Sequence, residues 1–395
     1  MRLGTRFVAI ALAAAVAALP AAADRGIEVE VARLDAPSEV TIAQARAAPE
    51  ASWIAADAMR RQATGSWWRL RIPPPVAGAD EGWVLAIREA FDAELVAYAP
   101  PDYRAQPLRT FDPARRQVGS RHRLAIALPA AHAAEPVYVR VERARGQPMG
   151  VAAASLADYV EEDAGRVRFT SMILSALLLL AAVSALYAIA LRRWMLLLFC
   201  FWVLSAAVYV LVMSGEIAWY VPHGGVLRHA MTISGVAIDL GVLAVYSFVI
   251  GFLGVPRHYP RLARLMQGLL ALAGASLVAL FVLPGSPLAS QLINIATLGL
   301  SACSLGAAVM RARAGSPQGW FFLFGWGILT VMGTWRAWRF LVQQGTPPWL
   351  EVAHPAAYVL GALVVVVATA RAARYAEREM PAARVVARTD ALTLL

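Results

Sequence analysis

Three ionisable side chains lie inside long apolar stretches of this sequence, where a charge is costly. Asp239 is flanked by isoleucine and leucine, and Arg336 and Arg339 stand three residues apart in a tryptophan-rich run. An ionisable group near the centre of a membrane-spanning helix costs about 2.5–3.5 kcal/mol on insertion scales and usually faces the interior of a helix bundle. These three residues are therefore candidates for a polar switch or a ligand contact within a membrane.

Each of these side chains also has a structural interpretation. Asp239 can fix helix packing as a neutral or paired group, and Arg336 and Arg339, which share one helix face, can extend toward lipid headgroups beside interfacial tryptophans. A third interpretation pairs Asp239 with Arg336. Their depths, counted from the helix ends on one side of a membrane, differ by about four residues, or roughly 6 Å, which an arginine side chain can bridge. The sequence leaves these alternatives open.

The residue types offer little support for catalytic chemistry. Lysine does not occur, so all 36 basic side chains are arginine, and a retinal Schiff base, which requires a lysine amine, is excluded. The six histidines show no metal-ligand spacing, and the two cysteines, Cys200 and Cys303, lie in apolar runs where small buried hydrophobes are expected. We therefore expect no catalytic residue, no metal and no cofactor in this chain.

The composition is that of a membrane protein. Of the 395 residues, 59% are hydrophobic and only 16% are charged, whereas about a quarter of the residues in a typical soluble domain are charged. This balance argues against a soluble enzyme, a disordered protein and a nucleic-acid binder. Segments of about the length that a helix needs to cross a bilayer are found at about 169–191, 194–213, 229–253, 265–283, 287–310, 320–342 and 354–371.

Arginine positions predict how these seven segments are oriented. The first, third and fifth connections carry two, three and two arginines, and the C-terminal tail carries five, whereas the other three connections carry only Arg228. Positive residues accumulate on the cytoplasmic side of a membrane. The C-terminus is thus predicted inside and the region before the first segment outside. Membrane topology therefore accounts for the net charge of +10 without a nucleic-acid partner.

The N-terminus has the pattern of a secretion signal. Arg2 and Arg6 precede an apolar run over residues 7–19, which Pro20 and three alanines follow. This pattern predicts a signal peptide over residues 1–23 that is cleaved between Ala23 and Asp24, because the apolar run is too short to cross a bilayer comfortably. In a bacterium, the following segment is then periplasmic.

The segment over residues 24–165 has the pattern of a β domain. Short runs in which apolar residues alternate with a period of two predict half-buried strands, and 84–87 and 95–98 are two further short candidates. Short strands between turns rich in proline and glycine favour an antiparallel sandwich. The three alternating sets are Trp68, Leu70 and Ile72, then Leu124, Ile126 and Leu128, then Val137, Val139 and Val141.

Several local sequences, together with the order of a β domain followed by membrane segments, resemble one bacterial family. The stretches 66–72 (Ser-Trp-Trp-Arg-Leu-Arg-Ile), 82–85 (Gly-Trp-Val-Leu) and 137–141 (Val-Tyr-Val-Arg-Val) resemble the type-2 extracellular sensor domain of bacterial seven-transmembrane receptors with diverse intracellular signalling modules. The resemblance extends over about residues 24–390. It implies a jelly-roll-like periplasmic domain that binds a small ligand such as a carbohydrate, with Trp68, Arg69, Arg71 and Arg140 as candidate ligand-binding residues.

The tail over residues 387–394 resembles the first helix of a GGDEF diguanylate cyclase domain, which usually opens with Asp-x-Leu-Thr-Gly-Leu. Asp390, Leu392 and Thr393 match this pattern, but Leu394 stands where the pattern has glycine, and no Gly-Gly-Asp/Glu-Glu-Phe sequence occurs in the chain. We therefore expect that the protein is not an enzyme as it stands. It is either a receptor without an output domain of its own or a truncated cyclase whose catalytic domain is missing after Leu395; a membrane transporter or assembly scaffold is a further alternative.

Together these patterns predict a periplasmic all-β jelly-roll-like sandwich followed by an all-α seven-helix transmembrane bundle. The expected divisions are a signal peptide (1–23), a sensor domain (24–165), a seven-transmembrane domain (166–371), and a cytoplasmic linker helix with the cyclase-like tail (372–395). The resemblance implies an inner-membrane receptor that relays a periplasmic signal to a cytoplasmic output. Its expected partners are the lipid bilayer, a periplasmic small molecule or carbohydrate, and a second copy of the chain or a cytoplasmic output protein.

Overall fold

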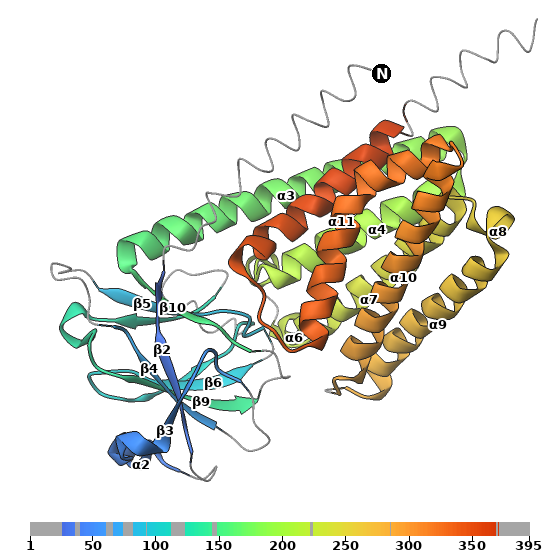
Figure 1. Ribbon diagram of the computed structural model, residues 1–395. Coiled ribbons are helices and arrows are strands. Elements are labelled where there is room, and N and C mark those ends of the chain that lie inside the picture. Colours follow the sequence, from blue (N-terminus) through green and yellow to red (C-terminus); the bar gives the residue numbers. More distant parts are fainter. Residues whose placement is uncertain are drawn as a thin grey trace, which may run out of the picture.

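The structure of this chain is a computed structural model, in which a β domain lies at one end of a bundle of long helices (Figure 1). It describes residues 26–35, 40–60, 66–73, 82–91, 93–111, 123–143, 148–221, 224–284, 286–368 and 370. The predicted signal peptide, its cleavage between Ala23 and Asp24, and the predicted linker and cyclase-like tail fall on residues outside these ranges.

Two antiparallel sheets pack face to face in the β domain, which confirms the predicted sandwich. The five strands expected from the alternating runs are all present as β4, β5, β6, β8 and β9. One sheet has the strand order β1 (Ile27–Glu28), β10 (Val151–Ser155), β5 (Trp83–Ile87) and β8 (Leu124–Leu128). The other has the order β3 (Trp53–Ala56), β2 (Glu30–Leu34), β4 (Ser66–Arg71), β9 (Val137–Arg143), β6 (Glu94–Tyr98) and β7 (Ala105–Leu108).

The core of the sandwich is formed by one side of each strand. Leu70 of β4 and Val139 of β9 belong to the same cluster as Leu85 and Ile126 of the smaller sheet, and each is at most 2% exposed. Burying such a side chain stabilises a fold by about 1.5–3 kcal/mol. The alternation of apolar residues with a period of two thus predicted which residues face inward, because successive side chains of a strand point to opposite sides.

The short helix α2 (Ile42–Ala47) packs on part of the outer face of the larger sheet. Thr41 caps this helix through a reciprocal exchange of hydrogen bonds with Gln44, which satisfies backbone donors that a helix start leaves open. Trp53 and Trp67 from the sheet form a second apolar cluster with residues of the helix.

Seven long helices follow the β domain within the described residues, and they correspond to the seven apolar segments. They are α3 (Leu156–Leu191), α4 (Trp194–Met213), α7 (Ala230–Phe252), α9 (Pro260–Val282), α10 (Leu288–Arg313), α11 (Pro317–Leu341) and a final helix, Pro348–Ala368. The connections contain the short helices α5 (Ile217–Tyr220), α6 (Gly224–Leu227) and α8 (Val255–His258). All of the long helices except α11 are long and apolar enough to cross a membrane.

The long helices run up and down, so their connections alternate between two ends of the bundle. We call the end beside the β domain the proximal end and the opposite end the distal end (Figure 1). The arginine-rich connections and helix ends, which include Arg192, Arg257 and Arg311, lie at the distal end. Large apolar side chains remain exposed along the helices, such as Met172 (71%) and Leu186 (67%) on α3. This apolar surface is suited to contact with lipid tails.

The bundle is held together by aromatic contacts at its centre. The Phe199 ring lies 5.4 Å from Trp202 on the same helix and 5.6 Å from Phe248 on α7. Trp326 of α11 joins them, with its ring centroid 5.3 Å from that of Trp202. Aromatic pairs with this spacing contribute about 0.5–1.5 kcal/mol each beyond the burial of their area. The cluster packs α4, α7 and α11 together.

Candidate functional site

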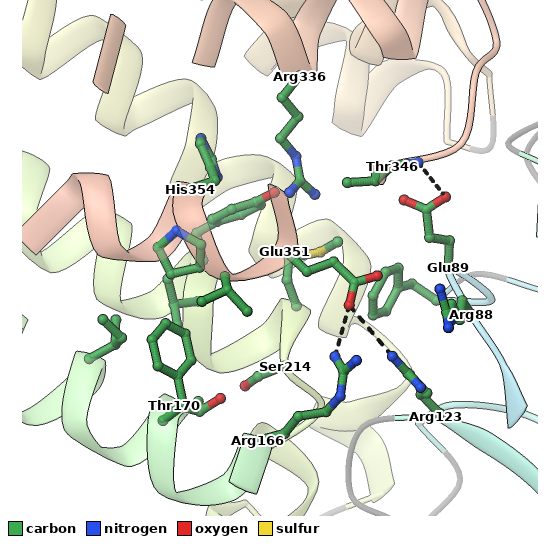
Figure 2. A pocket seen from close by; sticks show the side chains of 18 residues that line it. Arg88, Glu89, Arg123, Arg166, Thr170, Ser214, Arg336, Thr346, Glu351 and His354 are labelled. Carbon is green, nitrogen blue, oxygen red and sulfur yellow. Dashed lines mark hydrogen bonds and ion pairs between the residues drawn. The ribbon is translucent and has the colours of Figure 1, made fainter. Parts of the chain in front are cut away.

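Two adjoining pockets lie where the β domain meets the proximal end of the bundle. The junction pocket, drawn in Figure 2, has a volume of about 130 Å³ and is lined by the β domain, α3, α4, α11 and the final helix. The bundle cavity, of about 300 Å³, extends from it between α4, α7, α9, α10, α11 and the final helix. Side chains that line both pockets include Glu89, Tyr209, Arg336 and His354.

The β domain reaches the helices through the turn after β5. Glu89 has a positive φ of 58° in this turn, a conformation that is uncommon for residues other than glycine. The preceding residue, Arg88, donates a backbone hydrogen bond of 2.8 Å to the Gly150 carbonyl. An oxygen of the Glu89 carboxylate accepts a hydrogen bond of 3.1 Å from the backbone N–H of Thr346, just before the final helix (Figure 2).

A second connection is covalent, because β10 continues directly into α3. Ser155 ends the strand and caps the helix by accepting a hydrogen bond of 3.1 Å from the Asp158 N–H, as serine commonly does at a helix start. Tyr159, in the first turns of α3, packs against the outer face of the smaller sheet and is 3% exposed. No flexible linker separates the β domain from the 36 residues of α3.

Four charged side chains, which we call the junction cluster, join three elements at this place. Arg166 of α3 contacts Glu351 of the final helix and Glu162 of α3, at 2.8 Å in each case. Arg123, which precedes β8, lies 3.4 Å from Glu162 and 3.8 Å from Glu351. Figure 2 shows both arginines pointing toward Glu351. Two positive and two negative groups thus compensate one another across the β domain, α3 and the final helix.

Burial governs the electrostatics of the junction cluster. The side chain of Arg123 is 7% exposed and that of Glu162 is 13% exposed, so little water screens their charges. Burial and the neighbouring Arg166 lower the pKa of Arg123, and burial together with Arg123 lowers the pKa of Arg88 to about 10. These arginines remain charged at neutral pH, and each therefore requires a nearby negative group.

The bundle cavity differs, because its charged side chains are not paired with each other. The guanidinium carbon of Arg336 lies 5.7 Å from the centre of the Tyr209 ring, and the described residues place no carboxylate in an ion pair with it. Asp239 is 1% exposed and its Oδ2 has no hydrogen-bond partner in the described structure. The same holds for Nδ1 of His354, which is 4% exposed.

The polar residues predicted in the membrane segments are only partly brought together. Asp239 and Arg336 both line the bundle cavity, but no ion pair joins them among the described residues. Arg339 lines neither pocket; its guanidinium donates to the Gly345 carbonyl oxygen, at 2.8 Å from Nε. The three roles suggested for these residues therefore remain predictions.

The candidate ligand residues of the β domain do not form one surface. Trp68 is 2% exposed in the core between the sheets and donates a hydrogen bond of 2.9 Å to the Ser66 hydroxyl. By the alternation of the strands, Arg69, Arg71 and Arg140 point to the opposite side, the outer face of the larger sheet. The structure thus separates Trp68 from the three arginines.

Two of these arginines are engaged by one carboxylate. Arg69 donates to Glu50 at 2.7 Å and stacks over the Trp53 ring at 4.7 Å. Arg71 lies 3.5 Å from the same carboxylate, and its side chain is 40% exposed. Glu50 has a lowered pKa, because it accepts hydrogen bonds from Arg69. Arg71 and Arg140 are the more accessible members of this group.

The residues of the junction cluster were not identified from the sequence. Glu162 and Glu351 border predicted membrane segments, at 169–191 and 354–371, and Arg123 precedes an alternating strand. Carboxylates directly before apolar segments could have been singled out as a signal. Their partners could not, because Arg123 and Glu351 are brought together only by the docking of the β domain on the bundle.

Comparison with protein families bears on the helical part of the chain. A family model described as 7TM diverse intracellular signalling matches residues 167–373, which is more than half of the 395 residues. The matched region contains Arg336, Glu351 and His354, and so most of the bundle cavity. No curated protein matches this chain.

Proposed function

Because the chain belongs to the 7TM diverse intracellular signalling family, we propose that this membrane receptor senses a small periplasmic molecule and relays the signal through its helices to a cytoplasmic output. The family and the apolar helices support a multi-pass membrane protein of a signalling class. The orientation in this proposal rests on the arginine-rich distal connections, since positive residues accumulate on the cytoplasmic side.

Glu351 is the feature that best supports a relay. Its carboxylate lies 2.8 Å from Arg166 of α3 and 3.8 Å from Arg123 of the β domain. Moving any one of these three groups alone would deprive a poorly hydrated charge of one of its partners, at a cost of about 2–3 kcal/mol. A displacement of the β domain is therefore transmitted to α3 and the final helix together.

The two helices have the form that such a relay requires. α3 extends over 36 residues, roughly 54 Å at 1.5 Å per residue, from the β domain to the distal end. The final helix begins beside Glu351 and is described to Ala368 without interruption. A stiff helix conveys a shift or rotation along its length, and both helices end where a cytoplasmic output would be attached under the proposed orientation.

The ligand of the β domain, with a carbohydrate as one candidate, is proposed to bind the outer face of the larger sheet. Arg71 is partly exposed there, and Nε of Arg140 has no hydrogen-bond partner in the described structure. Guanidinium groups donate in a planar fork that suits hydroxyl and carboxylate oxygens. Trp68 is not included, because its side chain lies in the core.

Reporter fusions test the proposed orientation. Alkaline phosphatase, which is active only after export, should be active when fused after residue 160 and inactive when fused after residue 390. The opposite pattern would place the β domain in the cytoplasm and remove the basis for a periplasmic sensor.

A reversible crosslink tests the relay. Glu89→Cys with Thr346→Cys, in a background with Cys200→Ala and Cys303→Ala, would tie the β domain to the start of the final helix. An active GGDEF cyclase domain fused after Leu394 supplies the readout. We expect the cyclase rate to differ by at least about fivefold between the oxidised and reduced protein, as for a typical allosteric coupling.

The cysteine-free parent fused to the same cyclase is the control, and its rate should not respond to oxidant. Quantitative crosslinking, verified by mass spectrometry, combined with equal cyclase rates in the oxidised and reduced protein would show that this contact does not carry a signal.

A further inference from the structure

The bundle cavity has the dimensions and enclosure of a small-molecule site. Its volume is about 300 Å³, at the lower end of the range of ligand pockets. Its walls come from six of the seven long helices, all except α3, and Glu89 and Phe91 of the β domain close it at the proximal end. A molecule bound here would touch both the bundle and the β domain.

Arg336 supplies a positive charge for which the described residues provide no ion pair. Its nearest aromatic contact, the Tyr209 ring at 5.7 Å, offers a weak attraction compared with a carboxylate. A guanidinium carries five hydrogen-bond donors and cannot give up its charge within a protein. Because an enclosed charge is costly unless it is paired, Arg336 is suited to an anionic group that enters the cavity.

Glu89 lines the same cavity and attracts Arg336 electrostatically, but no ion pair joins the two side chains among the described residues. Its carboxylate accepts the Thr346 N–H at 3.1 Å, and burial raises its pKa, which favours the neutral form. The arginines of the junction cluster show the contrast, since Arg123 and Arg166 each contact two carboxylates. Arg336 alone of these three has no such contact among the described residues.

A hydrogen-bond acceptor lies on another wall of the cavity. Asp239 is 1% exposed, and its Oδ2 has no hydrogen-bond partner in the described structure. The Ser276 hydroxyl, on the same cavity wall, donates to the Ala289 carbonyl at 2.8 Å. An unpaired buried acceptor costs about 1–3 kcal/mol, and a hydroxyl or amino group of a ligand would satisfy it.

We propose that the bundle cavity binds a small aliphatic carboxylate that also bears a hydroxyl or amino group. Arg336 binds the carboxylate, Asp239 accepts a hydrogen bond from the hydroxyl or amine, and apolar side chains contact the carbon chain between them. The apolar wall includes Ile238, Val242, Leu280, Ile293 and Phe340. This site is separate from the sensor face of the β domain, so it adds a second ligand to the proposed receptor.

Binding of matched six-carbon compounds to the purified full-length protein in lipid nanodiscs tests the proposal. The probes are hexanoate, ω-hydroxyhexanoate, ω-aminohexanoate and hexylamine, measured by calorimetry and by the shift of the melting temperature. We expect the two substituted carboxylates to bind at least about tenfold more tightly than hexanoate, and hexylamine to bind most weakly. One satisfied hydrogen bond to a charged group corresponds to about this factor.

Two variants separate the two ends of the site. Arg336→Gln should weaken every carboxylate by at least about tenfold, because it removes the charged partner. Asp239→Leu, which removes both side-chain oxygens, should lower the affinity for the substituted carboxylates toward that of hexanoate and leave hexanoate within about twofold, since only the substituted compounds use this acceptor. Arg313→Gln, an exposed arginine of α10, is the control and should bind as the parent does.

Equal affinities for all four probes, or an Arg336→Gln variant that binds carboxylates as well as the parent, would overturn the proposal. If Arg336→Gln does not fold, the probe preference and the Asp239→Leu variant still decide. A failed relay is distinguishable, because the crosslinked cyclase fusion would then be unresponsive while the four probes still bind in the expected order.

Discussion

The junction cluster and the bundle cavity lie side by side and use arginine in different ways. In the cluster, Arg123 and Arg166 each contact Glu162 and Glu351. In the cavity, Arg336 lies over the Tyr209 ring, and the described residues hold no carboxylate in an ion pair with it. Both sites are at the proximal end, and the pockets beside them share lining residues such as Arg336 and His354.

The paired arginines of the cluster stabilise the structure, whereas Arg336 in the cavity is available to bind a ligand. The four charges of the junction cluster hold the β domain, α3 and the final helix in place, because removing any one of them leaves an unbalanced charge among the others. An arginine without a carboxylate partner gives little stability, but its donors remain available for a molecule from outside. We therefore expect the cluster to control stability and coupling, and the cavity to control binding.

The largest effect is expected for Glu351→Gln. The substitution removes the carboxylate that Arg166 contacts at 2.8 Å and leaves two poorly hydrated arginines with Glu162 as their remaining partner. We expect the free energy of unfolding to fall by about 2–3 kcal/mol, below the full cost of breaking a buried pair because Glu162 is retained. Chemical unfolding of the purified protein in micelles, followed by tryptophan fluorescence, measures this change.

Asp102→Asn is the matched control for the loss of a carboxylate. Asp102 lies 3.6 Å from Arg104 in a pair whose side chains are 64% and 85% exposed, and such pairs contribute about 0–1 kcal/mol. Equal stability of Glu351→Gln and the parent would show that the junction cluster does not hold the domains together.

An intermediate effect is expected for Arg69→Gln in the β domain. Arg69 is well buried and stacks on Trp53, but its partner Glu50 has a side chain that is 68% exposed. Glu50 keeps its hydration when Arg69 is removed, so we expect a loss of about 1 kcal/mol. Unfolding of the full-length protein should place this variant between Glu351→Gln and Asp102→Asn; a loss as large as that of Glu351→Gln would contradict the comparison.

A smaller effect is expected for Arg336→Gln without ligand. Losing the cation–π contact with Tyr209 destabilises the variant, whereas removing an enclosed charge stabilises it, so the two effects oppose each other. We expect the unfolding free energy to stay within about 0.5 kcal/mol of the parent. A loss near that of Glu351→Gln would mean that Arg336 is a structural ion-pair residue and that the two sites do not differ.

The smallest effect concerns Glu89 and appears only as a pH dependence. Burial raises the pKa of its carboxyl above the ordinary value of 4.5, so the folded protein holds this proton more tightly than the unfolded chain does. Its contribution to stability is therefore present below about pH 4.5 and is lost as the pH rises through the folded-state pKa. Glu89→Gln keeps an acceptor for the Thr346 N–H but has no carboxyl group to titrate, so its stability does not show this loss with rising pH.

The stability of the parent minus that of Glu89→Gln should accordingly decrease as the pH is raised from 4 toward neutrality. Melting temperatures of the two proteins in parallel buffers provide the measurement, because other groups titrate equally in both. A difference that increases with pH would show that the carboxylate is stabilised in its charged form.

Much of the architecture was predictable, because it depends on local patterns. The alternation at Leu124, Ile126 and Leu128 predicted both the strand β8 and its buried side, and the lengths of the apolar segments predicted the long helices. β3, β7 and β10 lack such a pattern and were not predicted. β10 is largely alanine, for example, and it is a strand because it pairs with β5 on one side and β1 on the other.

The candidate site was predicted less completely. Asp239 and Arg336, whose predicted depths differ by about four residues, both line the bundle cavity, and their pairing stays a prediction. Trp68 was assigned to ligand binding, although the alternation that identified its strand also placed it with Leu70 on the core side. Arg69 and Trp68 are neighbours in sequence but point to opposite sides of the sheet.

What the sequence determined by itself is what depends on spacing along the chain: the order of the parts, the sandwich and the long helices. Which charges meet was decided only by the tertiary structure. Arg123 and Glu351 are separated by more than half the chain. The sequence contains 36 arginines, and their spacing does not indicate which of them pairs with Glu351. The docking of the β domain on α3 and the final helix selects among them, because it brings these groups together away from water and leaves Arg336 facing the cavity.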